Sequence, residues 1–161
     1  MLKIIKQKRL NKNHTNDFLN LLNDVLTSDF PEYQLKTAQE YKKLYGKKWF
    51  KEEIKKKKNY FLGAFDKKTL IGVISFIGQP GGFGSVSWLF IDKKYRSQGV
   101  GISLLKKLEQ WLTKNNFHGY FLYTESQKNI DFYTKRGFRH VGTMINSWFG
   151  VNEHIMEKIL N

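Results

Sequence analysis

The fold is decided by the stretch Ile91-Asp92-Lys93-Lys94-Tyr95-Arg96-Ser97-Gln98-Gly99-Val100-Gly101. It follows residues 86–91, an apolar run rich in β-branched and aromatic side chains that is typical of a buried strand. Downstream, apolar residues recur at three- and four-residue intervals from Leu104 to Leu112, which is typical of an amphipathic helix. The stretch is therefore predicted to connect a strand to the N-terminus of a helix.

The composition of this connection favours an anionic ligand. The first backbone N–H groups of a helix have no internal partner, and the helix dipole adds positive potential there. Gly99 and Gly101 lack the Cβ atoms that would keep a phosphate away from the backbone. Two glycines at this spacing also suit a plain strand-to-helix turn, and the stretch is neither a P-loop nor the three-glycine dinucleotide fingerprint.

Length and composition limit the class of protein. The 161 residues are predicted to form a single domain over residues 1–161. Neither a run that could span a bilayer nor a signal peptide is recognisable, so a cytoplasmic location without membrane attachment is expected. Cysteine is absent, which excludes disulfides and thiolate nucleophiles. The four histidines are scattered along the sequence without i, i+4 spacing, so no metal site is predicted.

The chain is strongly basic, with 28 Lys and Arg against 14 Asp and Glu and a formal net charge of +14. A positive field of this kind attracts a phosphorylated cofactor or a nucleic acid. Residues 55–58 are all lysine, but such a run is more often a solvated surface. Because the sequence has no RNA-binding aromatic signature and no zinc finger, nucleic acid is the less favoured partner.

The rest of the chain alternates between strand-like and helix-like patterns. Strands are predicted at residues 2–8, 60–65, 69–77, 86–91, 119–123, 139–145 and 155–159. Helices are predicted at residues 15–27 and 127–135, with one or two more around residues 35–45 and 48–57. A further helix opens at the glycine turn and includes residues 104–114. Thr15 is predicted as the cap of the first helix and residues 79–84 as a loop. This pattern predicts an α+β (α/β) fold: a mixed, mostly antiparallel six- to seven-stranded sheet, helices on both faces, and a central βαβ unit.

A second motif follows downstream, Phe132-Tyr133-Thr134-Lys135-Arg136-Gly137-Phe138. Together, the two motifs resemble the GCN5-related N-acetyltransferase (GNAT) superfamily. Arg96, Gly99 and Gly101 fill the defining positions of that family's acetyl-coenzyme A loop. The second motif matches the close of the following helix in the family, and the order of predicted elements fits across nearly the whole chain.

The resemblance implies an enzyme that transfers acetyl from acetyl-coenzyme A to a primary amine by direct attack in a ternary complex. It implies that Tyr133 is the general acid for the departing thiolate. The cofactor-binding residues that it implies are Leu89, Phe90, Ile91, Arg96, Ser97, Gln98, Gly99, Val100, Gly101, Ile102, Ser126 and Tyr133. The acceptor is expected beside residues 28–59 and 146–150.

The sequence departs from the family pattern at three positions. Lys93 replaces a frequent proline, and Ser126 replaces an asparagine that contacts the cofactor in many members. Ser85 stands where histone-acetylating members carry a basic-catalyst glutamate, and its hydroxyl cannot serve as the base.

The general base is therefore open, with Asp92, Glu125, Glu153 and a bound water as candidates. An alternative function is a non-catalytic GNAT-fold module that binds acetyl-coenzyme A or nucleic acid. Another is a small basic RNA-binding domain in which the glycine turn is structural. Many relatives are monomers or dimers, so a homodimer is compatible with the sequence.

Overall fold

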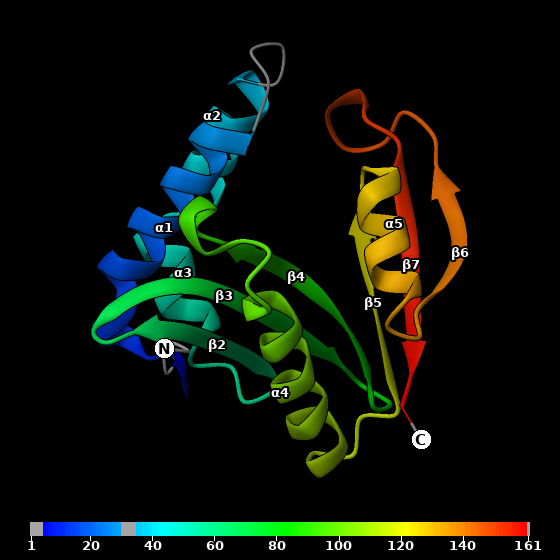
Figure 1. The fold of residues 1–161 in the computed structure, drawn as a ribbon, viewed down its shortest axis with the longest axis horizontal. Coiled ribbons are helices and arrows are strands. Elements are labelled where there is room, and N and C mark those ends of the chain that lie inside the picture. Colours follow the sequence, from blue (N-terminus) through cyan, green and yellow to red (C-terminus); the bar gives the residue numbers. More distant parts are fainter. Residues whose placement is uncertain (1–4, 30–34, 161) are drawn as a thin grey trace. The chain divides into compact units, whose positions relative to one another are not determined.

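The protein is described by a computed structural model that covers residues 5–29 and 35–160 (Figure 1). Its elements are, in chain order, β1 (Ile5–Arg9), η1 (Lys12–His14), α1 (Thr15–Asp29), α2 (Leu35–Leu44), α3 (Lys47–Glu53), β2 (Asn59–Asp66), β3 (Thr69–Gln79), β4 (Phe83–Ile91), η3 (Lys93–Tyr95), α4 (Val100–Lys114), β5 (Gly119–Thr124), α5 (Gln127–Thr134), β6 (Arg139–Met144), η4 (Trp148–Gly150) and β7 (Glu153–Ile159).

The seven strands form one sheet in the order β1-β2-β3-β4-β5-β7-β6. Strands β4 and β5 pair in parallel, whereas β1–β2, β5–β7 and β6–β7 are antiparallel. The parallel pair is joined through α4, since a parallel connection needs a crossover. The predicted mixed sheet with a βαβ unit is confirmed.

The chain forms two compact units, and the sequence passes between them more than once. The first unit consists of Met1–Phe76 and Trp88–Leu108, and the second of Ile77–Ser87 and Glu109–Asn161. The prediction of one domain over residues 1–161 stays a prediction. None of the described helices is long and apolar enough to cross a membrane.

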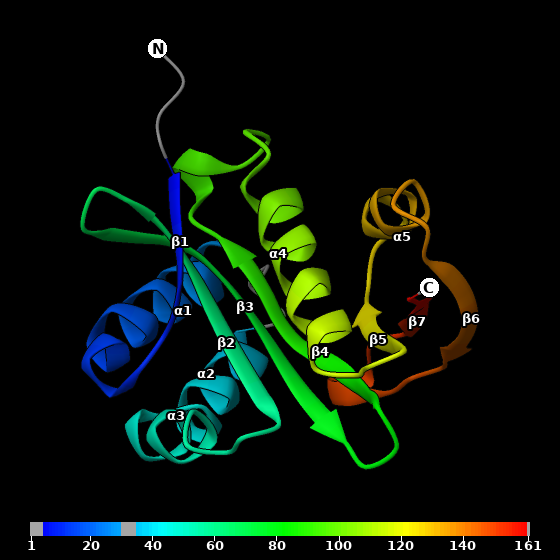
Figure 2. The ribbon, with the colours of Figure 1, turned by 90° about the horizontal axis from the view of Figure 1, so that it is seen from below.

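The core of the first unit is aromatic. Phe18 of α1 stacks on Phe50 of α3 at a centroid distance of 4.3 Å, and both rings approach Phe61 of β2. The apolar residues of α1 recur at helical spacing, so the helix buries one face against β2, β3 and β4. Helix α4 buries Val100 and Leu104. Figure 2 shows α4 on the opposite side of β2, β3 and β4 from α1–α3.

The core of the second unit is smaller and contains a polar network. Tyr120 and Met156 are fully buried, and Phe138 packs edge-on against Tyr120 at 5.3 Å between ring centroids. The Tyr120 hydroxyl donates to the Glu109 carboxylate at 2.7 Å, and Lys158 Nζ donates to the same oxygen at 2.6 Å. A buried phenol is thereby satisfied, as buried polar groups generally are.

Several predicted boundaries move. Strand β1 begins at Ile5, and residues 2–4 of the predicted strand lie outside the described residues. The predicted helix 48–57 ends at Glu53, because the lysines that follow form exposed turns. The predicted loop 79–84 shrinks to residues 80–82, since β3 runs to Gln79 and β4 begins at Phe83.

The predicted cap of the first helix is wrong. A short η1 turn precedes α1, and Asn11 caps that turn by accepting from the Asn13 N–H at 2.9 Å. The His14 ring accepts from the Asn11 N–H and completes a capping box. Thr15 instead donates its hydroxyl to the Lys12 carbonyl at 2.6 Å, so it does not cap the amides of α1.

Candidate functional site

The connection between β4 and α4 has an unusual backbone. Arg96 is extended, with φ −68° and ψ 157°, whereas Ser97 and Gly99 are left-handed, with φ 59° and 80°. A Cβ on Gly99 would meet no atom within 4 Å, so glycine is required there for its conformation and not for space. A Cβ on Gly101 would lie 3.9 Å from Ile91 Cγ1. The space beside Gly99 is therefore open, whereas Gly101 is half-buried next to the Ile91 side chain.

Short-range hydrogen bonds fix the connection. The Arg96 Nε–H donates to the Ile91 carbonyl at 3.0 Å, and the Gln98 side chain donates to the Lys94 carbonyl at 2.8 Å. The Asp92 carboxylate accepts from the Lys94 N–H at 2.8 Å and caps η3. Longer-range bonds tie the connection to the sheet. The Tyr95 hydroxyl donates to Asp66 of β2 at 2.8 Å, and the Asp92 N–H donates to the Ile71 carbonyl of β3 at 2.9 Å.

The amides at the start of α4 are suited to an anion. The Gly99 carbonyl accepts from the Ser103 N–H at 3.0 Å, so the amides of residues 100–102 precede the first intrahelical bond. Residues 96–99 are exposed to solvent, as are Lys93 and Lys94. Bare backbone, unpaired helix amides and positive charge together make a site that fits a phosphate group.

Strand β4, which leads into this connection, pairs with β5 only along its first residues. The parallel ladder between β4 and β5 contains three residue pairs and stops at Ser85, so residues 86–91 lie outside it. Phe90 is buried and packs against Phe18 at 5.9 Å between centroids, so its side chain belongs to the core. Leu89 and Ile91 are half-buried. At these three predicted positions it is the backbone that is suited to bind a ligand.

The second motif is a complete helix C-cap. Gly137 is left-handed with φ 84°, its N–H donates to the Thr134 carbonyl, and the Phe138 N–H donates to the Tyr133 carbonyl. The Phe138 and Tyr133 rings are in contact at 5.2 Å between centroids. These bonds and this contact define a Schellman motif. The glycine of the motif therefore ends α5, and the motif fixes the side of the helix on which Tyr133 packs.

Tyr133 is buried, with 9% of its surface exposed, and its hydroxyl makes no hydrogen bond to any of the described residues. Burial raises the pKa of the Tyr133 phenol to about 12, although Arg136 acts in the opposite direction. The phenol is therefore protonated at neutral pH and can donate a hydrogen bond or a proton.

The remaining predicted site residues have local roles or shifted acidity. Ser126 caps α5 by accepting from the Asn129 N–H at 3.3 Å, and Glu153 accepts from the Ser147 hydroxyl at 2.7 Å. Burial, and secondly the Glu153 charge, raise the pKa of the Glu125 carboxyl. Of the three candidate bases, Asp92 and Glu153 thus have hydrogen-bonded partners, and Glu125 has the perturbed acidity that is common in functional sites.

Two groupings were missed from the sequence. The Tyr95–Asp66 bond joins positions 29 residues apart. His140 and His154, treated above as scattered, meet across β6 and β7 with ring centroids 5.1 Å apart. Among the described residues no three or more His, Asp or Glu side chains gather as a metal-binding group. The strand register of β6 and β7 could have revealed the histidine contact, whereas the Tyr95–Asp66 bond joins η3 to β2 and follows no local pattern.

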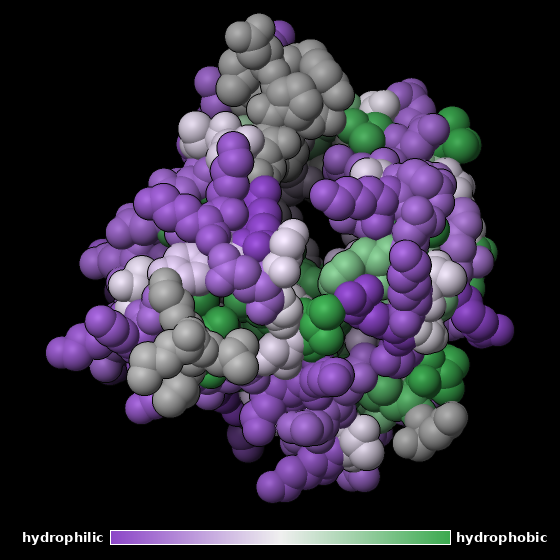
Figure 3. All heavy atoms as spheres, in the orientation of Figure 1, coloured by the Kyte–Doolittle hydropathy of each residue, from purple (hydrophilic) through white to green (hydrophobic). Residues whose placement is uncertain are grey.

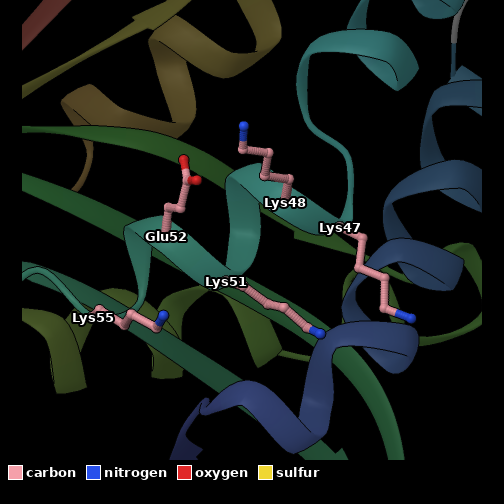
Figure 4. A pocket seen from close by; sticks show the side chains of 5 residues that line it. All are labelled: Lys47, Lys48, Lys51, Glu52 and Lys55. Carbon is pink, nitrogen blue, oxygen red and sulfur yellow. The ribbon is translucent and has the colours of Figure 1, made fainter.

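A pocket on α3 is lined by Lys47, Lys48, Lys51, Glu52 and Lys55. All five side chains are exposed, and Figure 4 shows Lys48 and Glu52 extending away from the side on which Lys47 and Lys51 lie. No buried polar group lines it, so the pocket is part of a solvated basic surface. Figure 3 shows such hydrophilic side chains over most of the face in view.

Comparison with known proteins identifies the family. Residues 28–160 match the acetyltransferase (GNAT) domain. Among solved structures, the PaiA N-acetyltransferase from Thermoplasma acidophilum, in complex with coenzyme A, aligns with a TM-score of 0.79 and 22% identity over 96% of this chain and 98% of its own. The ribosomal-protein-S18-alanine N-acetyltransferase from Escherichia coli aligns with a TM-score of 0.79 and 15% identity over 98% and 95%.

A spermidine N-acetyltransferase chimera from Vibrio cholerae and a second enzyme aligns with a TM-score of 0.74 and 17% identity, over 96% of this chain and 95% of its own. A comparison with curated protein sequences finds no significant match. GNAT domains use acetyl-coenzyme A as their cosubstrate, which agrees with a phosphate site at the start of α4. The chain belongs to the GNAT acetyltransferases.

Proposed function

We propose that this protein is an N-acetyltransferase that moves an acetyl group from acetyl-coenzyme A to a primary amine by direct attack. The observation that carries the proposal is the connection from Arg96 to Gly101, whose bare backbone and unpaired helix amides suit a pyrophosphate. The family membership supports the acetyl donor. The amine class is chosen because amines are the acceptors named for several structural neighbours.

In this proposal the α4 end of the loop holds the pyrophosphate through the amides of residues 97–102, with Arg96 adding charge. The backbone of Leu89, Phe90 and Ile91 pairs with the pantetheine arm as an added strand would, because that stretch of β4 lies outside the ladder with β5. Holding the thioester in a fixed position supplies the orientation that direct attack requires.

Tyr133 is the proposed general acid. The amine nitrogen forms a bond to the thioester carbonyl carbon, the carbon–sulfur bond breaks, and Tyr133 gives its proton to the departing sulfur. The raised pKa of the phenol, about 12, keeps this proton in place at neutral pH until the thiolate develops. The excess proton of the amine passes to water or to Glu125, whose pKa is raised by burial.

The test measures thiol release from acetyl-coenzyme A by the full chain with amino acids, peptide N-termini, lysine peptides, polyamines and aminoglycosides as acceptors. The Tyr133→Phe variant should lower kcat about 100-fold with little change in the KM for acetyl-coenzyme A. Tyr123→Phe is the matched control, because Tyr123 lies on β5 of the same unit and is 46% exposed.

An unchanged kcat in Tyr133→Phe would remove this residue from the mechanism. Binding of acetyl-coenzyme A without turnover on any amine would favour the non-catalytic module, for which Ser85 in place of an acidic residue is the relevant observation. Salt-sensitive RNA binding without any thermal shift from acetyl-coenzyme A would instead favour the RNA-binding function.

A further inference from the structure

The hairpin of β6 and β7 carries a bulge that changes which side chains share a face. Thr143 pairs with His154 and His140 pairs with Met156, with an irregularity between His140 and Gly142. In a regular strand, side chains three residues apart point to opposite faces. The extra residue of the bulge brings His140 to the same face as Thr143. Three polar side chains thereby meet on one side of the hairpin.

Their polar atoms form a nearly equilateral triangle. His140 Nε2 lies 3.2 Å from Thr143 Oγ1, Thr143 Oγ1 lies 3.0 Å from His154 Nδ1, and the two ring nitrogens are 3.3 Å apart. His140 and Thr143 are exposed and His154 is half-buried. The triangle is therefore open to solvent on the surface of the second unit.

The dimensions match one face of a coordination tetrahedron. Two imidazole nitrogens that ligate one tetrahedral Zn²⁺ are about 3.3 to 3.4 Å apart, and their ring centroids are about 5.2 Å apart. The observed values are 3.3 Å for the nitrogens and 5.1 Å for the centroids. Both values lie close to those expected for two rings bound to one ion.

A direct hydrogen bond between the rings accounts for these values less well. A straight N–H···N bond of the same length would place the centroids about 5.6 Å apart, because both rings would then lie along the bond. The centroids are closer than that, at 5.1 Å, and the ring planes are inclined at 63°. The two rings are therefore tilted away from a straight N–H···N arrangement.

We propose that His140 Nε2 and His154 Nδ1 bind a divalent transition metal ion, with the Thr143 hydroxyl at the third corner and solvent at the fourth. Imidazole nitrogens favour Zn²⁺, Cu²⁺ and Ni²⁺, whereas Mg²⁺ and Ca²⁺ favour oxygen ligands. Two histidines and one hydroxyl make an open site of modest affinity. The proposal does not depend on the acetyl-transfer chemistry.

The metal ion would link the two strands of the hairpin. His140 lies on β6, the last strand in the sheet order, and His154 lies on β7, which pairs with it. An ion bound to both strands binds the folded hairpin and not the separated strands, so it stabilises the fold by mass action. Saturating Zn²⁺ is therefore expected to raise the midpoint of thermal unfolding.

The test titrates Zn²⁺ into the full chain, prepared without a polyhistidine tag and freed of metal by chelation, with calorimetric detection. One Zn²⁺ should bind per chain, and His140→Gln or His154→Gln should each lower the affinity by about tenfold or more. His118→Gln is the matched control, since His118 is an exposed histidine of the same unit that does not belong to the triangle. Mg²⁺ should not compete.

A spectroscopic measurement identifies the histidine nitrogens that bind Zn²⁺. Two-bond proton–nitrogen correlation spectra should show Zn²⁺ shifting Nε2 of His140 and Nδ1 of His154, with His14 and His118 unchanged. The metal-free variants should keep the wild-type circular dichroism spectrum, which separates loss of a ligand from loss of the fold. Wild-type affinity in both histidine variants, shifts on the opposite nitrogens, or no Zn²⁺ binding by the folded wild-type chain would each overturn the proposal.

Discussion

The Arg96–Gly101 connection and the β6–β7 hairpin both gather polar groups at a surface, but they do so by different means. The connection is fixed mainly by bonds between residues two to five apart, such as Arg96 to Ile91 and Asp92 to Lys94. The hairpin triangle joins His140 to His154, 14 residues away, through strand register and a bulge. The first grouping is a continuous motif, whereas the second exists only once the strands are paired.

The largest effect is expected from Gly101→Leu, which changes the Arg96–Gly101 connection. A side chain at this position would cover the amides that we assign to the pyrophosphate, and loss of two charge-assisted hydrogen bonds costs about 3 kcal/mol or more, or over about 100-fold in affinity. Calorimetry with coenzyme A measures the change. Gly46→Leu is the control, because Gly46 also starts a helix and a Cβ there has its nearest atom at the same 3.9 Å. Equal coenzyme A affinity in both variants would contradict the assignment.

Gly137→Ala tests the other continuous motif through stability. A left-handed alanine costs about 1 to 2 kcal/mol, so the free energy of unfolding should fall by that amount. Chemical denaturation measures it, and Gly137→Asn should lose less because asparagine tolerates this conformation. If both variants are as stable as the wild type, the Schellman cap does not stabilise α5.

Tyr95→Phe removes a long-range bond of the connection, that from the Tyr95 hydroxyl to Asp66. The expected loss is about 1 kcal/mol in the free energy of unfolding, with a smaller decrease in coenzyme A affinity as the loop loses its tie to β2. Denaturation and calorimetry on one preparation separate the two effects. A loss of affinity as large as that of Gly101→Leu would mean that the connection is not fixed locally, and the comparison with the hairpin would fail.

The smallest effect is expected from Glu125→Gln, which removes a carboxyl with a raised pKa from the second unit. Burial raises the pKa of Glu125, so its protonated form is favoured in the folded state. The resulting stabilisation is complete below the ordinary carboxyl pKa and is lost as the pH rises through the raised value. Glu125→Gln should therefore be more stable than the wild type at pH 7, and the difference should shrink on acidification.

The measurement for Glu125→Gln is the free energy of unfolding at a series of pH values between 4 and 7. Glu52→Gln is the control, since Glu52 is an exposed glutamate of the first unit. Parallel curves for Glu125→Gln and the wild type would show that the carboxyl is not desolvated.

The features that could be predicted from the sequence are those with a local pattern of residues. Helical spacing in α1 and α4 and the β-rich runs gave the order of elements, and the two motifs gave the family. The glycine loop at residues 79–84 was overestimated, because a tight turn lets β3 and β4 continue to within three residues of each other. Thr15 was misassigned because a 3-10 turn moved the cap upstream to Asn11.

The remaining features depend on pairing that no local pattern contains. His140 and Thr143 have a spacing that a regular strand would separate, so the bulge had to be seen before they could be grouped. The Tyr120–Glu109–Lys158 network likewise joins a helix and two strands. The roles of Tyr133 and of residues 89–102 came from the family resemblance and stay predictions.

The bulge in β6 also bears on self-association. β6 is an outer strand of the sheet, and Val141 and Met144 are 51% and 43% exposed on it. An exposed edge strand that carries apolar side chains is a template on which another chain could add a strand and begin to aggregate. The bulge interrupts the regular row of backbone donors and acceptors that such templating needs. The same irregularity that brings two histidines together therefore protects the sheet from growing at this edge.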